Sequence, residues 1–132
     1  MLARNLNENS IFAVGVFCSF LVLYYFYNQF WFPPDDGAYA YVADRILAGD
    51  ILNLDVHDVH MGYINFLHAA ALKVFGNEMV SLRIPLLLLG VIQAAIIYKL
   101  LVSKGNLFAF CGTVVITSLS FVQFLNPTAN WY

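Results

Sequence analysis

The sequence predicts an all-α integral membrane protein with three transmembrane helices and two amphipathic surface helices in the first external loop. Hydrophobic residues make up 61% of the chain and charged residues 11%, a composition typical of membrane proteins. Three apolar stretches approach the length of about 20 helical residues that a bilayer core requires. The segment 32–85 holds seven of the eight acidic residues and all three histidines. We therefore expect a single membrane domain, residues 1–132, whose chemistry resides in that segment.

The first predicted transmembrane helix covers residues 11–32 and carries no charge. This stretch is longer than the apolar core of a signal peptide, and Phe32-Pro33-Pro34 lacks the small residues of a cleavage site. We therefore expect a retained anchor. Aromatic residues are concentrated in its last third, as they are where a membrane meets water.

The external loop, residues 33–83, is expected to begin with a short helix. Proline disfavours helical geometry in the residue before it, so Pro33 and Pro34 should end the first span. Asp36 would then cap a helix that stops at Gly49. Its apolar residues follow the spacing of one helical face: Tyr39, Val42, Ala43, Ile46 and Leu47. A helix of about 12 residues is too short to span, and we expect it to lie along the membrane surface.

A second amphipathic helix is predicted over residues 61–75, after a loop at 50–60 that shows no regular period. Gly76 and Asn77 would end it. Its apolar side is expected to contain Tyr63, Ile64, Leu67, Ala70, Ala71, Val74 and Phe75. We interpret His68 as a packed or interfacial histidine.

Two further transmembrane helices are predicted over residues 84–102 and 107–125, followed by an external tail, 126–132. Basic residues lie before the first span and around the turn between the other two, at Arg4, Lys99 and Lys104. Since basic residues remain on the cytoplasmic side, the N-terminus should be inside and the acidic loop outside. The scattered basic residues form no stripe that would bind nucleic acid. Cys18 and Cys111 fall within spans and are expected to be packing residues.

Asp35 and Asp36 are the candidate catalytic residues. They lie at the expected start of a helix, where the helix dipole stabilises negative charge. Adjacent carboxylates can act as a base and its support, or bind a divalent cation. The alternative is that Asp36 only caps the helix and that Asp35 is solvated.

Asp58 and His60 are candidate binding residues, and we expect them to face the same external pocket as Asp35. They belong to the segment 55–60, in which two histidines alternate with aspartates, as zinc ligands can. A zinc site normally requires three or four ligands on rigid elements, which disfavours zinc in this loop. Arg83 and Lys73 could hold a phosphate at the membrane surface or serve as snorkelling anchors.

The order of these features resembles the N-terminal part of the membrane-embedded GT-C glycosyltransferases, in particular the protein O-mannosyltransferases and the aminoarabinose lipid A transferases. In that family an acidic pair follows the first span, as Asp35-Asp36 does here. Asp58-Val59-His60 is similar to the Asp-Val-His of the mannosyltransferases, and residues 74–85 are similar to their Leu-Phe-Gly…Arg-Leu-Pro segment. Two departures are that Met61-Gly62 replaces a Pro-Pro and that the family has many more spans.

The resemblance implies transfer of a sugar from a polyprenyl-phosphate donor to an acceptor on the external membrane face. Asp35 would be the general base and Asp36 would support it, while His60, Asp58 and Arg83 would position the acceptor or the phosphate. The resemblance leaves open whether a divalent cation serves as cofactor. The implied location is a bacterial inner membrane or an equivalent membrane, with the first loop periplasmic or lumenal.

Three helices enclose little volume for a lipid-linked sugar, so we do not expect catalysis by this chain alone. An alternative is a truncated, non-catalytic relative that serves as a structural transmembrane subunit of a larger membrane complex, such as a respiratory or photosynthetic one. A third hypothesis is an unrelated three-span protein whose acidic loop binds a cation or a partner. The apolar spans predict contact with the lipid bilayer and with other transmembrane chains.

Overall fold

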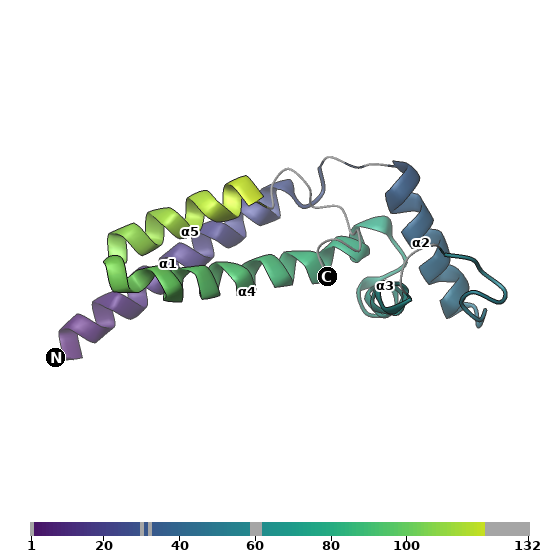
Figure 1. Cartoon of the computed structure of the whole chain (residues 1–132), viewed down its shortest axis with the longest axis horizontal. Helices are drawn as coiled ribbons and strands as arrows, with labels where there is room; N and C mark the ends of the chain where they lie inside the picture. The colour runs from purple at the N-terminus through teal and green to yellow at the C-terminus, as the bar shows by residue number, and fades with distance from the viewer. Residues whose placement is uncertain (1, 30, 32, 59–61, 121–132) are drawn as a thin grey trace. The chain divides into compact units, whose positions relative to one another are not determined.

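The computed structural model describes residues 2–29, 31, 33–58 and 62–120, and within them the protein is all-α, as predicted (Figure 1). These described residues form five α-helices and two short 3₁₀ helices, in the order α1, α2, α3, η1, α4, η2 and α5. These residues form two compact units. The span unit consists of residues 2–27 and 87–120, and the loop unit consists of residues 28–86.

The span unit contains α1 (Leu2–Phe26), most of α4 (Ile84–Leu101), η2 (Val102–Lys104) and α5 (Asn106–Ser120). Two segments are long and apolar enough to cross a membrane, by length and composition: Glu8–Phe26 and Met79–Lys104. The described part of α5 is apolar but shorter. Residues 121–125 of the third predicted span, and the predicted tail 126–132, lie outside the described residues.

The first helix begins and ends earlier than the predicted span 11–32. It begins at Leu2, where leucine, alanine, arginine and glutamate favour helix. It ends at Phe26, and a turn follows. The indole N–H of Trp31 donates to the backbone carbonyl of Asn28 at 3.2 Å and to its side-chain oxygen at 3.1 Å. These bonds stabilise the turn, so part of the aromatic cluster belongs to a connection.

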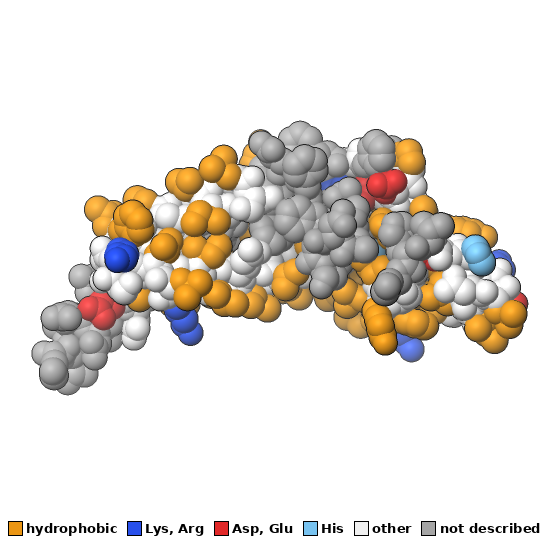
Figure 2. Space-filling view, viewed as in Figure 1, with side chains coloured by type: hydrophobic (Ala, Val, Ile, Leu, Met, Phe, Trp, Pro, Cys, Tyr) orange, Lys and Arg blue, Asp and Glu red, His pale blue; other side chains and the backbone are white. Residues whose placement is uncertain are grey.

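The packing of the span unit relies on small residues. Helices α1 and α5 pack against each other, and the buried residues of α5 are Ala109, Thr113 and Thr117. On α1, Ser19 is fully buried and its hydroxyl donates to the carbonyl of Gly15 at 3.0 Å. Small side chains let membrane helices approach closely. Hydrophobic side chains cover much of the visible surface around these helices (Figure 2). Of the two free cysteines, Cys18 is half-buried and Cys111 is exposed.

The loop unit contains α2 (Pro33–Leu47), α3 (Tyr63–Phe75) and η1 (Met79–Arg83). Helix α2 begins at Pro33, earlier than the predicted cap at Asp36. The first N–H groups of a helix have no intrahelical hydrogen-bond partner. Proline has no N–H group, so the two prolines cost the helix no hydrogen bond at these positions. Asp35 and Asp36 consequently lie in the first turn of α2 and not before it.

The core of the loop unit joins α2, α3 and η1. It consists of Tyr39, Ala43, Ala69, Leu72 and Leu82, with Ala40 and Ile46 packed at its edge. The predicted apolar face of α2 is therefore occupied by protein. Helix α3 and η1 thus cover much of this face, and the expectation that α2 lies along the membrane surface stays a prediction.

The predicted apolar side of α3 is divided between the inside and the outside of the unit. Ile64 and Ala71 are buried, whereas Tyr63, Leu67 and Val74 are exposed. The buried face also contains Asn65 and His68, which are fully inaccessible to solvent. Contact with α2 thus selects a face of α3 that hydrophobicity alone did not indicate.

The described part of the segment between α2 and α3, up to Asp58, is a loop, as predicted, and its acidic residues help to fold it. Asp50 forms an ion pair with Arg45, and Gly49 reverses the chain with a φ of 103°. The carboxylate of Asp55 accepts a hydrogen bond from the backbone N–H of Ile51 at 2.9 Å. Both carboxylates therefore have local structural partners.

Candidate functional site

The centre of the candidate site is a buried ion pair between Asp36 and Arg83. Both side chains are fully buried, and the guanidinium Nη2 lies 3.3 Å from the carboxylate Oδ2. The second guanidinium nitrogen, Nη1, donates to the backbone carbonyl of Gln29. The guanidinium carbon also lies 3.6 Å from the centroid of the Trp31 ring. We call Gln29, Trp31, Asp36 and Arg83 the arginine cluster.

The arginine cluster joins the end of η1 to two neighbouring segments about 50 positions earlier in the chain. Gln29 and Trp31 belong to the connection after α1, Asp36 to the first turn of α2, and Arg83 to the end of η1. Buried charges are unfavourable unless they are paired, and here each charge has an opposite partner. The N-terminal turn of α2 further stabilises the negative charge of Asp36. The cluster therefore fixes the position and the orientation of this turn.

Asp35 differs from Asp36 although the two are neighbours in sequence. Successive residues of a helix project about 100° apart. While Asp36 points into the arginine cluster, Asp35 is exposed. One carboxylate is thus held in place by protein contacts, and the other is accessible from the same rigid turn. An accessible carboxylate can accept a proton from a substrate that lies within hydrogen-bond reach of it.

A second polar group in the loop unit consists of Asp58, Asn65 and His68. The side-chain amide of Asn65 donates to the carboxylate of Asp58, whose own backbone N–H donates to Asn53 Oδ1 at 3.3 Å. The ring of His68 packs edge-on against Tyr39, with the centroids 5.3 Å apart. Burial lowers the pKa of His68 to about 4, while the negative charge of Asp58 acts in the opposite direction. His68 is therefore a packed, neutral histidine at physiological pH, as predicted.

The structure brings together only some of the predicted site residues. Asp36 and Arg83 are in direct contact, and Asp35 is adjacent to them. Asp58 instead interacts with Asn65. His60 lies outside the described residues, so its position in a shared pocket stays a prediction. The roles assigned to Asp35, Asp58 and Arg83 in binding or catalysis likewise stay predictions.

Sequence reasoning missed three of the interacting residues. Gln29 contributes through its backbone carbonyl, which no side-chain pattern could indicate. Trp31 was assigned to an aromatic belt, but its ring stacks on Arg83. Asn65 was overlooked, although its position one helical turn before His68 was a usable signal.

Metal binding in the loop unit has no support from the geometry of the described side chains. Among the residues that the structure describes, no three histidines, cysteines, aspartates or glutamates lie close enough together to hold an ion. The proposed ligand segment 55–60 includes two positions outside that set. A divalent cation therefore stays an open prediction.

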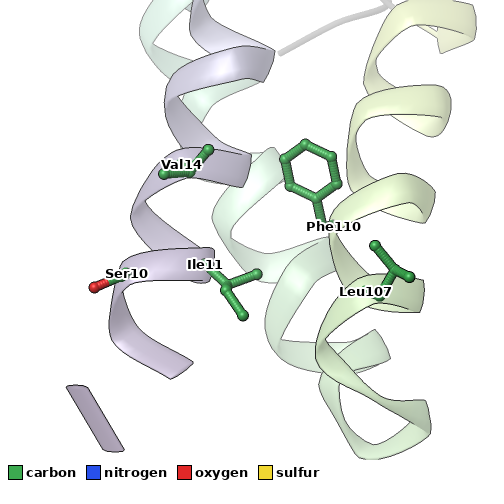
Figure 3. A pocket seen from close by; sticks show the side chains of 5 residues that line it. All are labelled: Ser10, Ile11, Val14, Leu107 and Phe110. Carbon is green, nitrogen blue, oxygen red and sulfur yellow. The ribbon is translucent and has the colours of Figure 1, made fainter. Parts of the chain in front are cut away.

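Among the described residues, side chains of the span unit line two pockets. The larger, of about 340 Å³, is formed by Ser10, Ile11 and Val14 of α1 together with Leu107 and Phe110 of α5 (Figure 3). The other, of about 250 Å³, is lined by Glu8, Asn9, Phe12, Tyr98, Lys99 and Val102. Neither contains a predicted site residue. The first has an almost entirely apolar wall and offers no group for acid–base chemistry.

Comparison with known proteins assigns neither a family nor a function to this site. The chain matches no protein-family model, no curated protein and no solved structure.

Proposed function

We propose that the chain is the N-terminal segment of a GT-C type glycosyltransferase and that it supplies a catalytic carboxylate, Asp35, at the external face of a membrane. The enzyme would move a sugar from a polyprenyl-phosphate donor to an acceptor. The observation that carries this proposal is the contrast within the acidic pair. Asp36 is buried against Arg83, whereas Asp35 is exposed on the same helical turn.

The chemistry assigned to Asp35 is general-base catalysis. The acceptor oxygen or nitrogen forms a bond to the anomeric carbon of the sugar, and the bond from that carbon to the phosphate oxygen breaks. The polyprenyl phosphate leaves with the bonding electrons, and Asp35 takes the proton of the acceptor. A correctly positioned base of this kind contributes about 10²–10⁴-fold to the rate. Asp36 and Arg83 would support the reaction by holding the turn on which Asp35 lies.

The proposed topology places the loop unit on the external side. Two helices with the length and composition of membrane spans are connected to this unit, at Glu8–Phe26 and Met79–Lys104. Arg4, Lys99 and Lys104 favour a cytoplasmic position for the opposite ends of these helices. A lipid-linked donor would keep its chain in the bilayer and present its phosphate and sugar to the acidic loop. Asp58 and His60 are proposed to position the phosphate or the acceptor.

The decisive experiment replaces Asp35 with asparagine in the full gene product. Membranes containing the protein would be supplied with a panel of radiolabelled polyprenyl-phosphate monosaccharides, and transfer to endogenous acceptors would be measured. Asp35→Asn should reduce transfer at least 100-fold. It should leave the helical circular dichroism unchanged.

Asp44→Asn is the matched control. Asp44 is an exposed aspartate of the same helix, and its Oδ1 accepts a hydrogen bond from Asn77 at 3.3 Å, which asparagine can also accept. This variant should transfer at the rate of the unsubstituted protein. Full activity of Asp35→Asn would refute the proposal.

A second candidate function is that of a structural transmembrane subunit. It is favoured by a line of exposed apolar side chains along α4: Leu88, Ile92 and Ile96. This line has the spacing of one helical face and suits contact with another membrane helix. In that case Asp35→Asn would have no effect, whereas Ile92→Trp would reduce the recovery of partner chains on purification in mild detergent.

A further inference from the structure

Helix α3 exposes an apolar side, although its buried side contains two polar residues beside four apolar ones. Its outward side carries Tyr63, Phe66, Leu67, Ala70 and Val74, which are spaced as one stripe along the helix. The exposed fractions of Tyr63 and Val74 are 89% and 71%. The middle of its inward side is instead polar, with Asn65 and His68 fully buried. We call the five outward residues the α3 stripe.

Water is an unfavourable environment for the α3 stripe. A helix on the surface of a soluble protein buries its apolar side and exposes its polar side. Here the side chains that would gain most by leaving water are those that the loop unit leaves uncovered. In Figure 2, hydrophobic side chains also gather around the position of α3. An apolar environment outside the unit would therefore stabilise the stripe.

We propose that the α3 stripe inserts into the surface of the lipid bilayer, so that α3 is an interfacial helix that anchors the loop unit. The first reason is continuity with a candidate span. Helix α3 packs against η1, which is the beginning of the segment Met79–Lys104. Only Gly76, Asn77 and Glu78 lie between Phe75 and this segment. At about 3.5 Å per residue, α3 cannot lie far from the membrane that the segment would enter.

The second reason is the chemistry at the borders of the stripe. Tyr63 lies at its start, and the exposed Lys73 lies beside it in the last turn. Both side chains combine an apolar body with a polar end, and they are suited to the headgroup region. A helix of 13 residues is about 20 Å long and can lie flat, with its apolar side about 5–10 Å deep. This inference does not depend on the proposed transferase activity.

Site-directed spin labelling of the full chain tests the proposal. Cysteine would be introduced at Phe66, Leu67 or Val74 in a background in which Cys18 and Cys111 are replaced by serine. Each labelled protein would be reconstituted into phosphatidylethanolamine–phosphatidylglycerol liposomes. Collision of the nitroxide with oxygen, which concentrates in lipid, would be compared with collision with a water-soluble nickel chelate. Circular dichroism would verify that each variant keeps its helical content.

The expected result is a high accessibility to oxygen and a low accessibility to nickel at all three positions. The matched control is a label at Asp44, an exposed position on α2, where the nickel chelate should collide freely. A label on the α3 stripe that collides freely with nickel would mean that the stripe is in water. A label that is protected from both reagents would mean that protein covers it. Either result would overturn the proposal.

Discussion

Helices α2 and α3 share one core but bury different kinds of residue in it. Helix α2 contributes Tyr39, Val42 and Ala43, together with a single buried charge, Asp36. Helix α3 places two polar residues, Asn65 and His68, at the middle of its buried side. The outer sides differ in the opposite sense, because α2 exposes charged residues and α3 exposes apolar ones. The difference teaches that position in the fold, and not the hydrophobicity of a side, determines which side of a helix is inside.

The largest expected effect comes from the buried charge of α2. Arg83→Met removes the positive charge that faces Asp36 and leaves its buried carboxylate without this ion pair. The free energy of unfolding should fall by about 3–5 kcal/mol. It can be measured by titration of the detergent-solubilised protein with sodium dodecyl sulfate.

The double variant Asp36→Leu with Arg83→Met provides the control for this measurement. It removes both charges and should recover most of the lost stability. A loss below about 1 kcal/mol in the single variant would place the pair in the range of solvent-exposed ion pairs.

Two leucines of α3 test the assignment of its sides. Leu72 is buried in the core, whereas Leu67 belongs to the α3 stripe. Leu72→Ala should reduce the unfolding free energy by about 2–5 kcal/mol, because it leaves a cavity. Leu67→Ala should cost no more than about 1 kcal/mol in detergent. Equal losses in the same titration would show that α3 is rotated relative to our description.

The buried His68 predicts a dependence of stability on pH. Its pKa falls from 6.5 in the unfolded chain to about 4 in the fold, so the unfolded state binds the proton more readily. Stability should be constant above about pH 6.5 and should decrease as the pH falls toward 4. The difference of pKa corresponds to at most about 3 kcal/mol. His68→Gln should remove this dependence in melting curves between pH 4 and 7, and an unchanged slope would assign it to other groups.

The smallest change in the free energy of unfolding is expected from substitution of the glycines that follow α2 and α3. The change should be similar at both positions. A glycine with positive φ closely follows each helix, with a φ of 103° at Gly49 after α2 and 107° at Gly76 after α3. An added Cβ would meet no atom within 4 Å at either position. A substitution by alanine should therefore destabilise the fold only through backbone strain. Gly49→Ala and Gly76→Ala should each reduce the unfolding free energy by about 1–2 kcal/mol. A large difference between them would reveal that the two ends are not equivalent.

Local pattern was sufficient to predict the helices of this protein but not their contacts. The helical spacing of Tyr39, Val42 and Ala43 correctly predicted one side of α2, and Gly76 correctly predicted the end of α3. The prolines marked a boundary, although α2 begins at Pro33 and not after the pair. For α3 the predicted apolar side proved to be divided between buried and exposed positions, because several sides of the helix carry apolar residues. Only the contact with α2 decides between them.

The candidate site was less predictable, because its interactions are long-range. Asp36 and Arg83 were both selected from the sequence, but their pairing spans 47 positions and has no local signal. The different exposure of Asp35 and Asp36 follows from this pairing, so it could not be anticipated either. The stacking of Trp31 on Arg83 was not predicted, because the aromatic cluster around Trp31 indicated a membrane interface.

The hydrogen bond from Arg83 to the carbonyl of Gln29 also has a consequence for the modularity of the chain. It joins the point where the chain enters the loop unit to a point close to where the chain leaves it. The ends of residues 28–86 therefore meet, and the segment has the geometry of a cassette inserted between two helices. Such a cassette can be exchanged for a short linker, or grafted between other helices, with only a small change in closure entropy.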